Sequence, residues 1–295
     1  MSVLRADAPA KINRELRVGP RRDDGYHPIL SRFTSIDLAD TLIAEPADAL
    51  ELSVEGAERA GIASDPSNLV WRAARLLAGR LGPSPGARIR LVKRIPAGAG
   101  LGGGSADAAV ALLLLSRLWN LALTQGELEE LASRLGSDVP YFLTGGEADI
   151  AGRGDVVTPR EDGSCENLFL LIPPFSMSTA EVYALYDRVR GDSGWTLPTR
   201  LDVETSGRFF GPNDLASAML KSTNEMTAYL RAAAQDVSDC CMTGSGSAIV
   251  LRGLSPEDAE ALLRRHPECR LLPTRTIGRD EYQRRIQPSG GPSWT

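Results

Sequence analysis

The feature that most constrains this chain is a glycine-rich loop between a predicted strand and a long apolar helix. Residues 96–109 read Pro-Ala-Gly-Ala-Gly-Leu-Gly-Gly-Gly-Ser-Ala-Asp-Ala-Ala and hold five of the chain's 29 glycines. Glycine permits positive φ and close backbone approach, so several N–H groups can point at one ligand. A helix predicted to begin at Ser105 adds unpaired N–H groups and the positive end of its dipole. The segment predicts a phosphate-binding loop rather than a flexible linker, because structured elements flank it.

Two common phosphate loops do not fit this segment. A Walker A loop ends in Gly-Lys-Ser/Thr, whereas residues 104–106 are Gly-Ser-Ala and lack the lysine. A dinucleotide fingerprint can be laid over residues 98–103, but it requires a βαβ unit and an acidic ribose partner, so that fit is weak. The loop therefore belongs to a different class of phosphate binder.

Composition and length limit the kinds of protein that this chain can be. It has 295 residues, 42% hydrophobic and 24% charged, which is enough for two cores in an ordinary globular enzyme. A net charge of −5 argues against a generally basic nucleic-acid or membrane surface and favours a small-molecule partner. The longest apolar run, 108–115, is far too short to span a bilayer, and no signal-peptide pattern precedes it. We expect a cytoplasmic protein, a monomer or weak homodimer, that binds neither nucleic acid nor membrane.

The four cysteines and two histidines give no metal-ligand pattern. No Cys-x-x-Cys pair is present, and Cys240 and Cys241 are adjacent in the sequence, so a disulfide between them would be strained. We expect four reduced thiols and no metal site made by the protein alone.

Periodicity predicts an α+β chain of two domains, 1–162 and 163–287, followed by a flexible tail, 288–295. Strands are expected at 7–18, 33–38 and 41–44, with Arg14 interrupting the apolar face of the first. Helices are expected at 68–81, from 105 to about 119, and at 125–135, and the polar run 160–164 is the expected linker. In the second half, Ser255 and Pro256 form a helix start as N-cap and first-turn residue.

The glycine loop resembles the Pro-x-x-x-Gly-Leu-Gly-Ser-Ser-Ala loop of the GHMP small-molecule kinases. Its Gly-Leu-Gly-Gly-Gly-Ser form is similar to that of one family among them, the 4-diphosphocytidyl-2-C-methyl-D-erythritol kinases. The resemblance implies a two-domain GHMP kinase fold, with an N-terminal α/β domain that carries the loop and a ferredoxin-like C-terminal domain. Four more segments resemble the same family: Pro9-Ala-Lys-Ile-Asn13, Asp24-Gly-Tyr-His27, Gly136-Ser-Asp-Val-Pro140 and Met242-Thr-Gly-Ser-Gly-Ser-Ala248.

Lys11 and Asp138 are the candidate catalytic residues. Taken alone, a lysine such as Lys11 at a strand end is usually just a solvated charge. Asp138, taken alone, is equally a capping residue after a helix. The resemblance implies that the two face each other at the phosphoryl acceptor. Phosphoryl transfer passes through a loose anionic transition state, and a carboxyl with a reference pKa of ~3.9 cannot ionise an alcohol beforehand. Asp138 is therefore expected to orient the hydroxyl and take its proton as the bond forms, with Lys11 keeping Asp138 ionised.

Tyr26, His27 and Tyr183 are the candidate residues for binding a cytosine base. Without the resemblance, Tyr26 and His27 are equally a half-buried turn pair. The resemblance implies that Tyr26 stacks on the base, Tyr183 closes the other side, and His27 reads the edge. Because stacking tolerates any base, selectivity must come from hydrogen bonds by His27 and nearby backbone. The resemblance also implies substrate contacts by Asn13, Thr179 and Asp138.

On the nucleotide side, the resemblance implies ATP as co-substrate and Mg²⁺ bridging its phosphates. Ser105 is expected to bind phosphate or the magnesium shell, and the segment 242–248, otherwise a simple hairpin turn, to support the loop. Magnesium is coordinated mainly by substrate oxygens and water, so no set of protein ligands is expected. The expected ATP-binding residues are Asn68, Lys93, Pro96, Ala97, Gly98, Ala99, Gly100, Leu101, Gly102, Gly103, Gly104, Ser105 and Ala106.

The implied reaction is transfer of the ATP γ-phosphoryl group to the 2-hydroxyl of 4-diphosphocytidyl-2-C-methyl-D-erythritol, in the non-mevalonate route to isoprenoid precursors. A homoserine or mevalonate-type kinase is the nearest alternative, but these lack the Asp-Gly-Tyr-His segment. A catalytically inactive ligand sensor is an alternative of another class, and retention of Lys11 and Asp138 argues against it. One departure stands out: the family usually has apolar residues where Arg14 and Glu15 stand, which leaves the packing of the first strand open.

Overall fold

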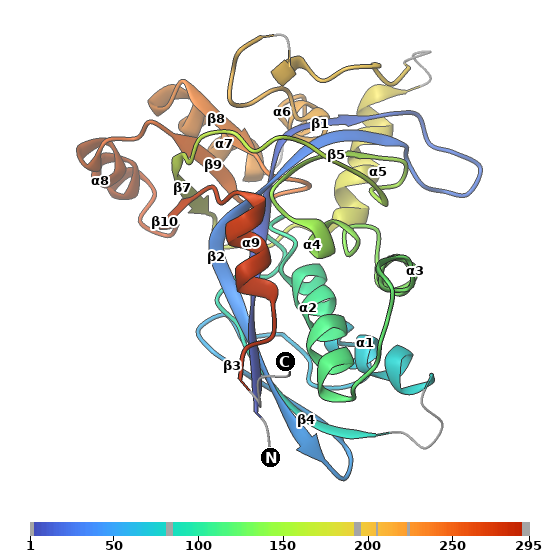
Figure 1. Cartoon of the computed structure of the whole chain (residues 1–295). Coiled ribbons are helices and arrows are strands. Elements are labelled where there is room, and N and C mark those ends of the chain that lie inside the picture. Colours follow the sequence, from blue (N-terminus) through green and yellow to red (C-terminus); the bar gives the residue numbers. More distant parts are fainter. Residues whose placement is uncertain (1–2, 81–84, 192–195, 205, 223–224, 291–295) are drawn as a thin grey trace.

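The computed structural model describes residues 3–80, 85–191, 196–204, 206–222 and 225–290. Its axis is a long antiparallel pair, β1 (Leu4–Val18) and β2 (Ile29–Ala47), which runs through much of the molecule (Figure 1). The opposite edge of β2 is shared, because β4 (Gly86–Val92) pairs with its second half and β5 (Glu147–Ala151) with its first. The strands β3 (Leu50–Glu55) and β6 (Val156–Pro159) complete the sheet, whose order is β3-β4-β2-β5-β6 with β1 beside β2.

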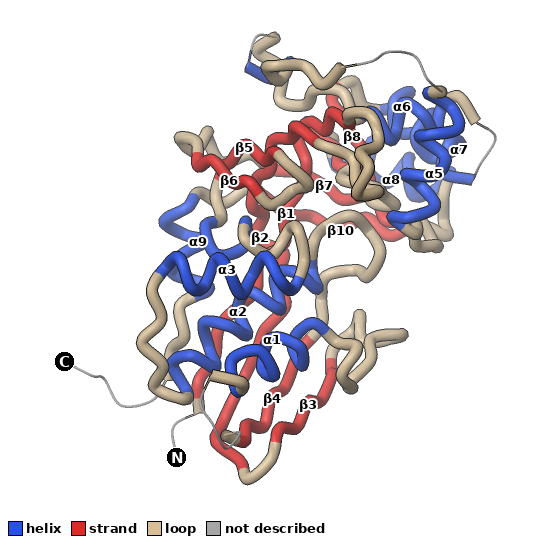
Figure 2. Tube along the Cα trace, turned by 90° about the vertical axis from the view of Figure 1, so that its right-hand side faces the viewer, coloured by secondary structure: helices blue, strands red, loops and turns tan. Residues whose placement is uncertain are grey.

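Helices cover one face of the long sheet, as Figure 2 shows for α1, α2 and α3. The helix α2 (Gly103–Leu118) is the central one, and most of its side chains are buried against β1, β2 and its neighbours. The predicted helix 125–135 is confirmed as α3 (Gln125–Leu135), begun by a capping box in which Thr124 and Glu127 bind each other's backbone N–H. The remaining helices here are α1 (Leu69–Ala78) and the short α4 (Tyr141–Thr144).

The second sheet has four antiparallel strands in the order β10-β7-β9-β8. In chain order these strands are β7, β8, β9 and β10, with helices between β7 and β8 and between β9 and β10. The chain therefore follows the β-α-β-β-α-β succession of a ferredoxin-like unit. The predicted cap at Ser255 is confirmed, since its hydroxyl accepts the N–H of Asp258. The elements are β7 (Asn167–Ile172), α5 (Thr179–Arg190), the 3₁₀ turn Asp202–Glu204, α6 (Asp214–Leu220), α7 (Glu225–Asp236), β8 (Asp239–Met242), β9 (Ile249–Arg252), α8 (Pro256–Arg265) and β10 (Arg270–Arg275).

Several predicted elements have other boundaries in the structure. The strand expected at 7–18 begins earlier, at Leu4. The helix expected to begin at Ser105 begins at Gly103, because Gly102 takes a left-handed conformation and starts it without a side-chain cap. The strands expected at 33–38 and 41–44 are one strand, β2, and Asp40 between them is buried and accepts the N–H of Ile95 at 2.9 Å. The helix expected at 68–81 begins at Leu69 and ends at Ala78, and its predicted last residue, Leu81, lies outside the described residues.

The chain returns to the first sheet through α9 (Arg279–Ile286), which packs beside β1 and β2 (Figure 1). Its buried Tyr282 donates a hydrogen bond to the carbonyl of Phe142, 2.7 Å away. Beyond it, Ser289 exchanges two backbone hydrogen bonds with Arg5, so the expected tail 288–295 is paired at its start, and residues 291–295 lie outside the described residues. The domain boundaries stay a prediction. Among the described helices, none is both long and apolar enough to cross a bilayer.

Candidate active site

A cavity of about 1020 Å³ lies where the glycine loop, β1, α5 and the turn after β8 meet. With one exception, every residue predicted to bind ATP or substrate, or to act in catalysis, lines this cavity. The exception is Ala106, which is buried within α2. The five sequence segments that resemble one family are therefore brought to one place, although they are spread over most of the chain.

The glycine loop is held in a shape that side chains would prevent. Gly98, Gly100 and Gly102 have φ values of +65°, +75° and +72°. A Cβ on Gly100 would lie 2.1 Å from the carbonyl oxygen of Thr243, and one on Gly102 would lie 2.6 Å from the ring of Phe142. Gly102 caps α2 with no side chain, so the first N–H groups of that helix are left without a capping acceptor. This arrangement suits an anion such as a phosphate.

The turn after β8, residues 242–248, supports the loop from behind. The Thr243 hydroxyl accepts the N–H of Asn13 at 2.9 Å and lies 3.3 Å from the carbonyl oxygen of Gly100. The N–H groups of Ser247 and Ala248 donate to the carbonyls of Gly98 and Ala99, at 3.3 and 3.2 Å. The Thr243 hydroxyl and backbone hydrogen bonds thereby join the loop, β1 and the turn.

Lys11 and Asp138 lie side by side in the wall of the cavity. The Lys11 ammonium is 3.9 Å from Asp138 Oδ2, donates to Asn13 Oδ1 at 2.6 Å, and lies 4.4 Å from the centre of the Phe33 ring. Lys11 is buried, whereas about a third of the Asp138 side chain is exposed. Burial lowers the pKa of Lys11, and the negative charge of Asp138 opposes that shift. A fixed cation thus lies beside a carboxylate that solvent or a ligand can reach.

The predicted base-binding residues surround the other end of the cavity. The His27 ring lies 5.2 Å from that of Tyr183, and its two nitrogens face acceptors: Nδ1 is 2.8 Å from the carbonyl oxygen of Gly19 and Nε2 is 3.3 Å from Asp187 Oδ1. Tyr26 is exposed, and the Arg153 guanidinium is 5.1 Å from its ring centre. Thr179 shares a 3.0 Å hydrogen bond with Ser245.

Comparison with known proteins agrees with this geometry. The family model of the GHMP kinases N terminal domain matches residues 68–146. A curated 4-diphosphocytidyl-2-C-methyl-D-erythritol kinase from Salinispora tropica is 39% identical over 271 residues, which cover 88% of this chain and 86% of the relative. The chain belongs to this kinase family. A further member, from Mycolicibacterium vanbaalenii, is 41% identical over 194 residues, but the match spans 66% of this chain and 60% of that relative's length.

The fold is also similar to that of a solved structure from the same family. The crystal structure of a 4-(cytidine 5'-diphospho)-2C-methyl-D-erythritol kinase matches with a TM-score of 0.72 and 31% identity, over 93% of this chain and 99% of the other. The expected GHMP kinase fold is thereby confirmed.

Two residues expected to bind nucleotide already form hydrogen bonds with other residues of the protein. Asn68 begins α1, where its side chain accepts the N–H of Val70 and donates to the carbonyl of Ala63. The Lys93 ammonium is buried between the carboxylates of Asp40 and Asp107, 2.7 Å from Asp107. Both residues line the cavity, but in this structure their polar atoms bind other protein groups.

Sequence reasoning missed several residues of this site. Asp187, Arg21 and Arg153 all line the cavity. A helical spacing could have revealed Asp187, because it lies four residues after Tyr183 and eight after Thr179, on the same face of α5. The two arginines lie in turns, where no periodicity points to them.

Asp107 carries the clearest electrostatic prediction. Burial raises its pKa to about 8, against the attraction of Lys93, and one of its oxygens has no hydrogen-bond partner. A carboxyl with a raised folded-state pKa binds more protons folded than unfolded. Its contribution is therefore fully present below the unfolded pKa, near ~3.9, and is lost as the pH rises through the folded one. Asp107→Asn should remove this dependence.

The measurement is the free energy of unfolding by denaturant at pH values of about 5, 7 and 9. We expect the variant to gain stability relative to the unsubstituted protein as the pH rises. Asp258→Asn, at an exposed position of α8, is the control and should give a parallel curve. If the Asp107→Asn curve is also parallel, Asp107 is ionised throughout and the assignment fails.

Proposed function

We propose that this protein transfers the γ-phosphoryl group of ATP to the 2-hydroxyl of 4-diphosphocytidyl-2-C-methyl-D-erythritol. The observation that carries the proposal is the meeting of a phosphate loop and the Lys11–Asp138 pair in one cavity. The loop and the unblocked start of α2 bind the ATP phosphates through backbone N–H groups. The family that the chain belongs to supports the choice of substrate.

In this mechanism Asp138 orients the substrate hydroxyl and accepts its proton as the new P–O bond forms. Lys11 is fixed by Asn13 and the Phe33 ring, so its charge stays beside Asp138 and the transferring oxygens. Positioning and charge neutralisation supply most of the catalysis in this class of reaction.

Magnesium fits this site as an ion carried mainly by the nucleotide. Among the described residues, no group of three or more His, Cys, Asp or Glu side chains could hold a metal. The Ser105 hydroxyl at the start of α2 lines the cavity and offers one hard oxygen ligand. When bound, Mg²⁺ would neutralise charge on the ATP phosphates.

His27 and Asp187 together suit the edge of a cytosine base. The Gly19 carbonyl oxygen only accepts, so His27 Nδ1 donates to it, which leaves Nε2 on the side of the Asp187 carboxylate. The Asp187 carboxylate is an acceptor for the amino group of a base. Cytosine has an amino donor at N4, whereas uracil has an acceptor oxygen at that position. Tyr183 packs on His27, and Arg21 and Arg153 add positive charge where a diphosphate would lie.

Substrate identity is tested by offering three alcohols in parallel. ATP consumption is measured with the cytidyl substrate, mevalonate and homoserine at equal concentrations. We expect turnover with the cytidyl substrate to exceed that with the other two. Preference for another alcohol would make the protein a different GHMP kinase, and consumption with none of them would favour a ligand sensor.

Asp138→Asn tests the assignment of the proton acceptor. Loss of the carboxylate should lower kcat by about 100-fold or more, because the amide of asparagine cannot accept the proton of the hydroxyl. Nucleotide affinity, measured by calorimetry, should change little, since the loop is untouched. Asp258→Asn is the matched control and should retain full activity. Turnover of the Asp138→Asn protein within about tenfold of the unsubstituted enzyme would show that Asp138 is not the base.

Asp187→Asn tests base selectivity. The unsubstituted enzyme should prefer the cytidyl substrate over its uridyl analogue, and the amide should reduce that preference by about tenfold, because it can donate to the uracil oxygen. The measurement is kcat/KM for the two substrates. Glu181→Gln, an exposed position on the same helix, is the control. An unchanged ratio of the two kcat/KM values in Asp187→Asn would show that Asp187 does not recognise the base.

A further inference from the structure

Arg14, which departs from the apolar pattern of the family, lies at a β-bulge next to the active site. The register between β1 and β2 shifts between Asn13 and Glu15, so Arg14 is the extra residue of the bulge. Its guanidinium donates to the carbonyl of Phe209 at 2.9 Å, and its own carbonyl accepts the N–H of Gly211 at 2.9 Å. Arg14 therefore contacts residues 209–213, which we call the clasp segment.

The ring of Phe209 in the clasp segment lies near two guanidinium groups. Arg14 is 4.3 Å from the ring centre and Arg252, on β9, is 5.1 Å from it. Arg252 is held in turn by Glu166 and Asp239, both at 3.0 Å. Cation–π attraction is strongest where the cation is partly removed from water, and the Arg14 side chain is only 14% exposed. This contact joins β1 of the first sheet to β9 of the second.

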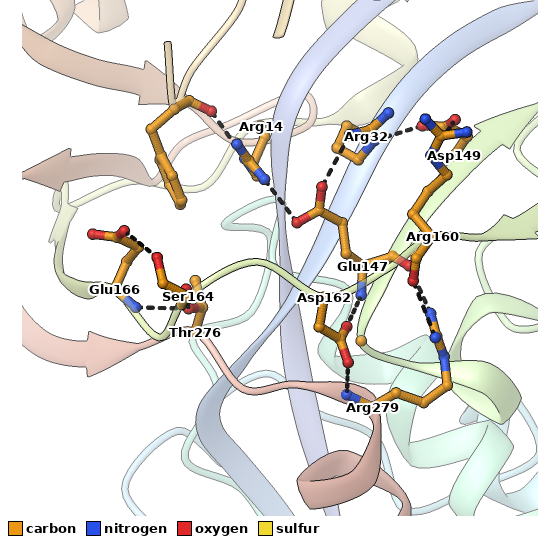
Figure 3. Close-up of polar contacts among 12 residues, drawn as sticks. Arg14, Arg32, Glu147, Asp149, Arg160, Asp162, Ser164, Glu166, Thr276 and Arg279 are labelled. Carbon is orange, nitrogen blue, oxygen red and sulfur yellow. Dashed lines mark hydrogen bonds and ion pairs between the residues drawn. The ribbon is translucent and has the colours of Figure 1, made fainter. Parts of the chain in front are cut away.

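The charge of Arg14 is balanced by a carboxylate that a second arginine also holds. Arg14 lies 2.7 Å from one oxygen of Glu147, and Arg32 lies 2.9 Å from the other (Figure 3). Arg32 also pairs with Asp149 at 2.5 Å. Because Glu147 is nearly buried and Arg32 stays beside it, removal of Arg14 would leave Glu147 with a partner. Substitution of Arg14 would therefore weaken mainly its contacts with the clasp segment.

The clasp segment reaches the active site through Asn213. The Asn213 amide donates to the carbonyls of Met242 and Gly244, at 2.7 and 2.9 Å, and so holds the turn whose Thr243 contacts Asn13 and Gly100. The N–H of Leu16 binds the carbonyl of Pro212 at 2.9 Å. Beside it, the buried Glu15 fills the space above Gly211, where a Cβ would lie 2.3 Å from its carboxylate.

We propose that Arg14 is a positioning residue, which acts through the clasp segment to set the register between the strand of Lys11 and Asn13 and the turn behind the phosphate loop. This inference rests on the proposed function. A shift of this register would move the loop relative to Asp138, and a displacement of about 1 Å in such a site can cost about 100-fold in rate. Arg14 is not among the residues that line the cavity, so its effect is indirect.

The first experiment compares Arg14→Leu with Arg88→Leu. Arg88 is an exposed, ion-paired arginine on β4, so its substitution removes the same charge far from the clasp segment. Assays are run well below the thermal midpoint of each variant. We expect kcat to fall by about ten- to a hundredfold in Arg14→Leu, with KM for ATP changed by less than about threefold, and Arg88→Leu to retain full activity.

The second readout does not use the reaction. Hydrogen exchange is measured in peptides that cover the clasp segment and the turn 242–248, whose Ser247 and Ala248 amides bind the phosphate loop. Exchange should be faster in both peptides of Arg14→Leu and unchanged in Arg88→Leu. If the enzyme turned over no cytidyl substrate, the proposed function would fail, while this comparison would still decide whether Arg14 fixes the turn.

Arg14→Lys completes the series. Lysine keeps the charge toward Glu147 but lacks the guanidinium fork that also reaches the Phe209 carbonyl. We expect its kcat to lie between those of Arg14→Leu and the unsubstituted enzyme, with partial protection of the turn. Faster exchange confined to residues 209–213, together with unchanged kcat in Arg14→Leu, would give Arg14 a merely structural role and overturn the proposal.

Discussion

The structure depends on one close approach of backbones, that of the glycine loop and the turn after β8. Gly100 lies so near the Thr243 carbonyl that a methyl group does not fit between them. The Thr243 hydroxyl adds the backbone of Asn13 to the same contact. Backbone contacts and the hydroxyl of Thr243 therefore fix the glycine loop, the strand of Lys11 and the second sheet relative to one another. Only the absence of a Cβ makes that approach possible.

The parts of the fold that depend on interactions between residues close in the sequence could be predicted. The helix at 125–135 and the cap at Ser255 follow from side chains that bind nearby backbone, and both are confirmed. The helix start at Ser105 was wrong because capping rules look for a polar side chain, whereas Gly102 begins α2 without one. The division of β2 was wrong because Asp40 suggests a turn, and its buried partners, Ile95 and Lys93, come from elsewhere in the chain.

In the candidate site, too, the residues in local sequence motifs could be predicted, whereas contacts between distant segments could not. The glycine loop, Lys11 and Asp138 carry motifs, and the structure brings them together. The partners of Arg14 lie more than a hundred residues away, in Glu147 and in the clasp segment, so no local pattern could reveal how its charge is accommodated. Glu15 pairs with the nearby Arg17 at 3.2 Å, but its other carboxylate oxygen accepts the N–H of the distant Val203. The expected stacking of Tyr26 and Tyr183 around a base stays a prediction. Here Tyr183 packs on His27, and Tyr26 lies exposed near Arg153.

The return of α9 to the first sheet has a consequence for how the chain matures on the ribosome. Domains usually fold in the order in which they are synthesised. Here the sheet that contains Lys11 lacks Tyr282 under Gly145, and the pairing of Arg5 with Ser289, until the second sheet has already been made. The nascent N-terminal half therefore emerges with part of its apolar surface uncovered. Its final packing waits for translation of the residues that follow the second sheet, which couples completion of the first sheet to synthesis of the second.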